Sequence, residues 1–209
     1  MKAGRKRLFD VNETLEKAML IFWENGFSGT SLTDLTSGLG INKPSLYAAF
    51  GNKEQLYSAA LNYYLNNFSS PRYAKLTEPK EDDLKTRLHS LLYNLAQRIT
   101  DTKTPKGCLF VNSSCESGGN GMPDSITQSI KDYKKDSHDY LVNLFDHEQQ
   151  QGHLDSAINS AEISTHLMVV MFGMCVLAKN GSHLADLIPV INLTVNTILN
   201  PQAYGAHHA

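Results

Sequence analysis

Apolar residues recur at steps of three and four positions along most of this chain, and this period is the strongest constraint on its fold. Between about Asn12 and Asn25 the steps predict a helix with one apolar face, formed by Leu15, Ala18, Met19, Phe22 and Trp23. Strict alternation of apolar and polar residues, which would indicate strands, is scarce. The sequence therefore predicts an all-α fold.

Glycines and capping residues divide the first part of the chain into short helices. Gly26 is expected to end the first helix. Ser31 and Asp34 have the spacing of a capping box at the start of a second helix, which ends at Gly38-Leu39-Gly40. The second helix is therefore only about two turns long.

A third short helix follows this glycine turn. Asn42 can cap it, with Pro44 tolerated in its first turn, and the helix is expected to end near Phe50. Asn52 then caps a fourth helix. Two short helices joined by a tight glycine turn predict a helix-turn-helix over residues 31–50, with its second helix suited to a DNA major groove.

The residues of the third helix suit this role. Ile41, Leu46 and Phe50 would face inward, and Asn42, Lys43, Ser45, Tyr47 and Ala48 would face outward. Lys43 can reach guanine acceptors, and Ala48 or Ala49 can meet a thymine methyl group. The candidate contacts outside this helix are Ser31, Thr33 and Lys53, with Ser31, Tyr47 and Lys53 placed for phosphates, and Arg5 and Arg7 on an arm suited to the minor groove. The pattern alone leaves open a packed helical unit that does not bind DNA.

The rest of the chain predicts a larger helical part. Polar segments around residues 69–71 and 77–83 are expected to be connections, and later loops are expected at 101–107 and 117–123. Further helices are predicted over residues 83–100, 108–116, 123–151, 160–179 and 184–199. The last two are apolar on more than one face, which fits either a buried core pair or a dimer seam.

Composition argues against several other classes of protein. Three cysteines without CxxC spacing indicate neither a disulfide framework nor a zinc site, and neither a metal nor a cofactor is expected. The longest apolar run, Leu167–Ala178, is shorter than the ~18 residues that span a bilayer, and no signal peptide is evident, so a cytoplasmic protein without membrane contact is expected. The net charge of −2 excludes a uniformly basic coat but not a local DNA-binding face.

Cys108 is the candidate sensor residue. It would stand at a helix N-terminus beside Lys106, and both features favour the reactive thiolate. The alternative is a buried cysteine that acts as a small apolar residue. Cys115 lies two helical turns further on, ~10 Å away, which disfavours a disulfide between the two. Tyr93, Phe145, Met168 and Phe172 would line either an apolar effector pocket or an ordinary core.

Three segments together resemble the N-terminal domain of TetR-family transcriptional regulators. They are Gly26–Leu32, Gly40–Phe50 and Asn52–Leu56, within a resemblance that covers about residues 8–60. The resemblance implies DNA contacts by Lys43, Pro44, Ser45, Tyr47, Ala48 and Lys53. It also implies an all-helical dimer that usually represses transcription and leaves its operator when an effector binds. The segment Lys106–Asn112 resembles a subset of the family in which some members sense electrophiles or oxidants through the cysteine.

These observations combine into one expectation. Residues 1–55 are expected to form the helix-turn-helix domain, and residues 56–209 a larger domain for effector sensing and dimerisation, with the fourth helix linking the two. The expected partners are double-stranded operator DNA, a second copy paired through the last two helices, and a small-molecule effector of unknown identity. The alternatives are a helical protein–protein interaction module and an enzyme using Cys108 as nucleophile, for which no base is legible in the sequence.

Overall fold

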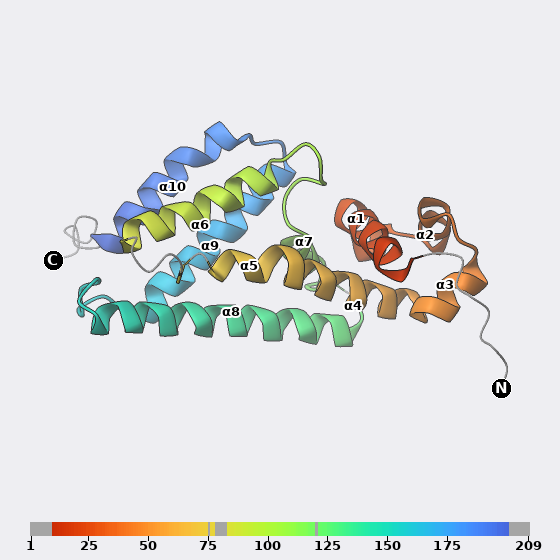
Figure 1. The fold of residues 1–209 in the computed structure, drawn as a ribbon, viewed down its shortest axis with the longest axis horizontal. Coiled ribbons are helices and arrows are strands. Elements are labelled where there is room, and N and C mark those ends of the chain that lie inside the picture. The colour runs from red at the N-terminus through yellow and green to blue at the C-terminus, as the bar shows by residue number, and fades with distance from the viewer. Residues whose placement is uncertain (1–9, 75, 78–82, 120, 201–209) are drawn as a thin grey trace.

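The computed structural model describes residues 10–74, 76–77, 83–119 and 121–200. Over these ranges the chain forms helices and no strand, which confirms the predicted all-α fold. The N-terminal unit consists of α1 (Val11–Gly29), α2 (Leu32–Leu39) and α3 (Lys43–Phe50). Helix α4 (Lys53–Tyr64) leads from this unit into the larger C-terminal part (Figure 1).

The predicted caps position the short helices. The amide of Asp34 donates to Ser31 Oγ at 3.1 Å, and the amide of Ser31 donates to Asp34 Oδ2 at 2.8 Å, so the capping box is present. Asn42 Oδ1 accepts from the amide of Ser45 at 2.9 Å. Gly40 has a φ of 66°, a conformation that glycine adopts without cost, and this allows the tight turn between α2 and α3.

Gly26 interrupts α1 and does not end it. Its φ of 74° breaks the helical path, but the chain resumes a last helical stretch to Gly29. This backbone conformation favours glycine, and a Cβ atom here would lie 1.8 Å from Glu116 Oε1 and would displace that carboxylate. The predicted helix end at residue 26 is therefore a kink.

The expected connection at Ser69-Ser70-Pro71 is wrong, because the helix continues through it. A π-helical turn (Leu65–Ser69) follows α4 and leads directly into α5 (Ser70–Ala74). Proline lacks an amide hydrogen and its ring crowds the preceding turn, so a regular α-helix is disfavoured there. The wider π turn, in which the Ser70 amide donates to the Leu65 carbonyl, accommodates Pro71, and Arg98 Nη1 donates to the nearby carbonyl of Phe68.

The C-terminal helices have the boundaries that the sequence predicts to within about two residues. They are α6 (Leu84–Ile99), α7 (Leu109–Glu116), α8 (Asp124–Gln150), α9 (Ser160–Lys179) and α10 (Leu184–Leu199). Helix α8 runs below α4 and α5 in Figure 1 and packs against α9, and α6 packs against α9 and α10. The short helix α7 contacts α1, α4, α8 and α9, so it lies between the N-terminal unit and the helices that follow.

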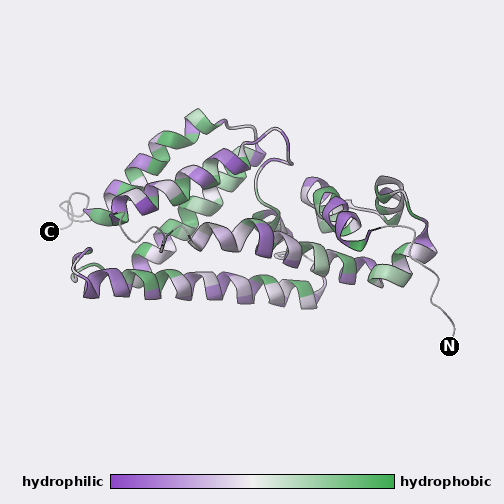
Figure 2. Cartoon of the chain, in the orientation of Figure 1, coloured by the Kyte–Doolittle hydropathy of each residue, from purple (hydrophilic) through white to green (hydrophobic). Residues whose placement is uncertain are grey.

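The apolar run Leu167–Ala178 forms only part of α9, which is 20 residues long. By length and composition it is the one helix among the described residues that is long and apolar enough to cross a membrane, and 39% of its most apolar window is buried. It packs against α6, α7, α8 and α10. Much of α10 has the colour of hydrophobic residues in Figure 2. Seven large apolar side chains in the described ranges remain exposed, and five of them lie on α9 and α10: Val169, Val176, Leu177, Ile188 and Leu193.

A buried ion pair joins α6 to the end of α8. Arg87 donates two hydrogen bonds to Glu148, at 3.0 Å to Oε1 and 2.8 Å to Oε2, and His153 Nδ1 lies 2.9 Å from Oε2. Burial acts to raise the pKa of Glu148, but the hydrogen bonds from Arg87 and His153 outweigh it and hold this pKa below its ordinary value. The carboxylate is therefore ionised at neutral pH and its charge is matched.

We expect Glu148→Gln to lower the free energy of unfolding at pH 7 by about 3–5 kcal/mol, because it removes the carboxylate charge that accepts two hydrogen bonds from the buried Arg87 guanidinium. The wild-type contribution is complete above the ordinary carboxyl pKa of about 4.3 and is lost as the pH falls through the lower folded pKa. The difference between the two proteins should therefore shrink below about pH 4. Urea unfolding at one fixed protein concentration measures it. The exposed Asp139→Asn is the control, and an equal loss in both variants would contradict the role of the buried pair.

Candidate nucleic-acid interface and sensor cavity

One face of α3 is buried and the other is open. Leu46 is fully buried, and Ile41 and Phe50 are partly buried against the core. The exposed residues of this helix and its cap are Asn42, Lys43, Pro44, Tyr47 and Ala48, and Ser45 is half-buried. Tyr47 is 45% exposed. The predicted inward and outward faces are therefore the faces that the structure has.

The other candidate contacts lie at helix starts. Ser31 and Thr33 are exposed at the first turn of α2, where backbone amides provide a favourable place for phosphate. Lys53 is the first residue of α4 and is half-buried. Arg5 and Arg7 lie outside the described residues.

Lys53 has protein contacts of its own. Its ammonium nitrogen lies 4.2 Å from the centroid of the Phe27 ring, a cation–π arrangement. Burial lowers the pKa of Lys53 below its ordinary value, although the carboxylate of Glu116 acts in the opposite direction. Lys53 is therefore held at the contact between α1 and α4.

Glu116, the last residue of α7, is a site residue that the sequence did not indicate. Its Oε2 accepts a hydrogen bond of 2.9 Å from the amide of Phe27, which follows the kink in α1. Asn112 of the same helix donates to the carbonyl of Trp23 at 3.3 Å. A glutamate at the end of a short helix has no distinctive pattern, and its partner is 89 residues away. These two contacts link α7 to the DNA-binding unit.

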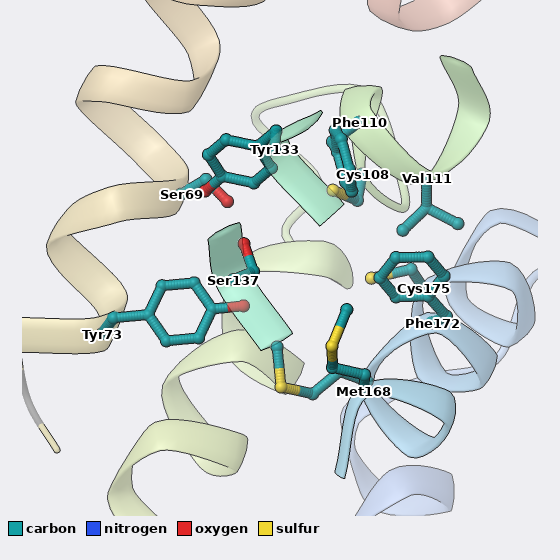
Figure 3. Close-up of a pocket in the computed structure, with 11 residues that line it drawn as sticks. Ser69, Tyr73, Cys108, Phe110, Val111, Tyr133, Ser137, Met168, Phe172 and Cys175 are labelled. Carbon is teal, nitrogen blue, oxygen red and sulfur yellow. The ribbon is translucent and has the colours of Figure 1, made fainter. Parts of the chain in front are cut away.

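The other end of α7 reaches a small cavity. Cys108 is the N-cap residue of α7, as predicted, and it is 2% exposed. The hydroxyl of Tyr64 donates to Cys108 Sγ at 3.2 Å. Side chains of α5, α8 and α9 converge on the same space (Figure 3), and the lining residues are Ser69, Tyr73, Cys108, Phe110, Val111, Tyr133, Ser137, Met168, Met171, Phe172 and Cys175. The cavity has a volume of about 20 Å³, which holds a water-sized molecule but not an effector.

The predicted sensor residues are only partly brought together. Cys108, Met168 and Phe172 line this cavity. Tyr93 stacks on His89 with ring centroids 6.0 Å apart, and Phe145 is fully buried, so neither faces the cavity. Among the residues that the structure describes, no group of three or more His, Cys, Asp or Glu could hold a metal ion.

Known proteins are similar to this chain over most of its length. Residues 15–60 match the profile of the bacterial regulatory proteins, tetR family, and residues 85–183 match that of a tetracyclin repressor-like C-terminal domain. The HTH-type transcriptional repressor ComR of Escherichia coli (strain K12) is 29% identical over 194 residues, which are 92% of this chain and 90% of ComR. The uncharacterized HTH-type transcriptional regulator YezE of Bacillus subtilis (strain 168) is 33% identical over 113 residues, 54% of this chain and 57% of YezE.

A solved structure is similar in both domains. It is a cysteine mutant of the TetR-family transcriptional regulator CifR in complex with a 26-base-pair operator DNA, with a TM-score of 0.84 and 29% identity over 93% of this chain and all of that chain. The two matched profiles cover, in order, the helix-turn-helix unit and most of the C-terminal helices. This chain belongs to the TetR family of bacterial transcriptional regulators, which are DNA-binding proteins.

Proposed function

We propose that this protein is a transcriptional repressor that binds a palindromic operator as a homodimer and leaves it when its C-terminal domain takes up an effector. The observation that carries this proposal is the open face of α3, which is fixed from behind by the fully buried Leu46. We assign DNA binding to residues 1–55 and effector sensing and dimerisation to residues 56–209, with α4 shared between them.

We assign the interface residues to base contacts, to the surface of α3 against the groove, or to phosphate and minor-groove contacts. Lys43 donates to guanine in the major groove and Ala48 contacts a thymine methyl group, so these two residues specify sequence. Asn42, Pro44 and Ser45 complete the surface of α3 against the groove. The residues that contact phosphates and set the register are Ser31, Thr33, Tyr47 and Lys53, and Arg5 and Arg7 enter the minor groove.

The exposed apolar residues of α9 and α10 support a homodimer. Val169 is 65% exposed and Leu193 is 53% exposed, and contact with a second copy would remove this apolar surface from water. Two helices from each subunit would form a four-helix bundle about a two-fold axis. That symmetry places two α3 helices about one DNA turn apart, ~34 Å, and requires a palindromic operator.

Helix α7 provides a route for release. Its start lines the sensor cavity, and its end binds the backbone of α1 through Glu116. An effector that binds one position of α7 better than the other shifts the population of the two states and changes the spacing of the two recognition helices. The proposed site of action is the cytoplasm, where operator DNA lies in a bacterium.

A thiol enzyme is the weaker candidate. Nucleophilic catalysis by Cys108 needs an adjacent base, and the side chains that line its cavity include no histidine, lysine or carboxylate. A protein–protein adaptor would not need the exposed polar face of α3. We therefore propose that the protein has no enzymatic activity.

The proposed function is tested with DNA that flanks the gene of this protein. We expect a gel shift at moderate salt that a palindromic segment competes for and a shuffled segment of equal length does not, because specific sites exceed non-specific binding by ~10³-fold or more. Equal competition by both segments would contradict a sequence-specific regulator.

Lys43 and Lys53 should differ in their effect on specificity. We expect Lys43→Ala to reduce discrimination between the operator and a single-base variant by ~1–3 kcal/mol, whereas Lys53→Ala weakens binding to all sequences alike. Fluorescence anisotropy with matched DNA duplexes measures both effects, and circular dichroism checks that the fold is retained. Lys85→Ala in α6 removes the same charge far from α3 and should leave the affinity unchanged. Identical behaviour of the Lys43 and Lys53 variants would refute this division of roles.

The cysteine proposal requires a conformational opening, because Cys108 is buried. If Cys108 senses oxidants or quinones, treatment should release the wild-type protein and the Cys115→Ser variant from the operator, and Cys108→Ser should remain bound. Cys115 is exposed and is therefore expected to be modified first, without release. Equal release of wild type and Cys108→Ser in the gel shift would remove Cys108 from the mechanism.

A further inference from the structure

The sensor cavity is lined by two thiols, although the proposed function uses only that of Cys108. Cys175 of α9 lines the same cavity and is 3% exposed, and Cys108 is 2% exposed. Figure 3 shows both side chains in the cavity wall, with their sulfur atoms on the side of the cavity. The third cysteine, Cys115, is exposed. The structure therefore brings together two buried cysteines that lie far apart in the sequence.

The backbones that carry the two buried thiols are in contact. Gly107 precedes Cys108, and a Cβ atom added to Gly107 would lie 3.0 Å from the carbonyl oxygen of Cys175. A disulfide joins Cα atoms ~4.4–6.8 Å apart, and consecutive Cα atoms of the chain are ~3.8 Å apart. A bond between Cys108 and Cys175 therefore needs only a small shift of either backbone. Cys115 lies ~10 Å further along α7 and cannot take this place while the helix is intact.

The surroundings of Cys108 favour its reactive thiolate. It is the N-cap residue of α7, where the first amides of the helix carry partial positive charge. The hydroxyl of Tyr64 also donates to Cys108 Sγ at 3.2 Å. Cys175 lies inside α9 and does not have a helix start beside it. Cys108 is therefore the thiol that an oxidant attacks first, and Cys175 is the second.

The size of the cavity selects the oxidant. A volume of about 20 Å³ holds a water-sized molecule. Hydrogen peroxide is the peroxide nearest to water in size and is uncharged, so it enters with little rearrangement of the lining side chains. A quinone or an organic hydroperoxide is much larger and reaches the two thiols only when α7 or α9 moves.

We propose that Cys108 and Cys175 form a dithiol site, which hydrogen peroxide converts to a disulfide between α7 and α9. In the first step the Cys108 thiolate attacks one peroxide oxygen. The S–O bond forms, the O–O bond breaks, and the leaving hydroxide takes up a proton to become water. In the second step Cys175 Sγ attacks the sulfur of the Cys108 sulfenic acid. The S–S bond forms, the S–O bond breaks, and the hydroxyl group leaves as water with the thiol proton of Cys175.

The two thiols together lose two electrons and two protons, and one peroxide molecule is reduced to two molecules of water. The reaction uses no group of the DNA-binding unit. It therefore stands or falls independently of the proposed function, and protein without DNA is sufficient to test it.

The bond is tested on the full-length protein by mass spectrometry after treatment with hydrogen peroxide and alkylation of the remaining thiols. Digestion with chymotrypsin, which cleaves after Phe110, separates Cys108 from Cys115. We expect a linked pair of peptides that contain Cys108 and Cys175, and dithiothreitol should separate them. In Cys175→Ser the second step is lost, so Cys108 should proceed to sulfinic acid, which dithiothreitol does not reverse.

Two variants serve as controls, and circular dichroism checks their fold. Cys115→Ser keeps both cavity thiols and should form the bond to the wild-type extent. Cys175→Ala should behave as Cys175→Ser does, without a new hydroxyl group in the cavity. In urea the folded contact is lost, and a bond between Cys108 and Cys115, which close the shortest loop, should predominate.

The size argument is tested with cumene hydroperoxide in place of hydrogen peroxide. We expect it to oxidise Cys108 at least ~10-fold more slowly, relative to the exposed Cys115, because a local opening must come first. Equal relative rates with the two peroxides would contradict selection by the cavity. Oxidation of Cys108 in the folded wild type without a bond to Cys175, or no reaction of Cys108 when Cys115 is fully oxidised, would overturn the dithiol site.

Discussion

Two buried tyrosines of α4 hold α7 in place, and the relation between the two parts of the molecule depends on them. The hydroxyl groups of Tyr57 and Ser113 share a hydrogen bond of 2.6 Å, and Tyr64 donates to Cys108. Burial raises the pKa of Tyr57, so the phenol stays neutral and keeps its proton for this bond. A buried polar group without its partner costs ~1–3 kcal/mol of free energy, so moving α7 away from the two tyrosines is unfavourable.

The same two tyrosines fix α1 from the other side. The Tyr57 ring packs edge-on against Phe22 with centroids 4.8 Å apart, and Tyr64 packs against Trp23 at 4.9 Å. Helix α4 therefore joins α1 to α7 through one layer of aromatic side chains, and Glu116 adds a direct bond from α7 to α1. Well-packed side chains transmit strain instead of absorbing it, so this aromatic layer is the proposed route between α7 and the recognition unit.

Local chemistry made the N-terminal unit predictable. Ser31 and Asn42 cap their helices with side chains only a few residues from the amides they bind, so the contacts follow from the sequence itself. The inward and outward faces of α3 follow from the helical period. Pro71 was misleading because a local rule predicts a break there, whereas a π turn precedes the proline and the helix continues through it.

The sequence by itself determined the helical fold, the helix-turn-helix, the face of α3 that is open to DNA and the place of Cys108 at a helix start. Only the tertiary structure decided that Cys108 is buried, that Lys53 lies on Phe27 beside Glu116, and that three lysines of α8 line a pocket together with residues of α9. The physical reason is the distance along the chain. Caps and helical faces arise within a few residues, but burial, ion pairing and pocket shape depend on helices that meet from segments far apart in the sequence.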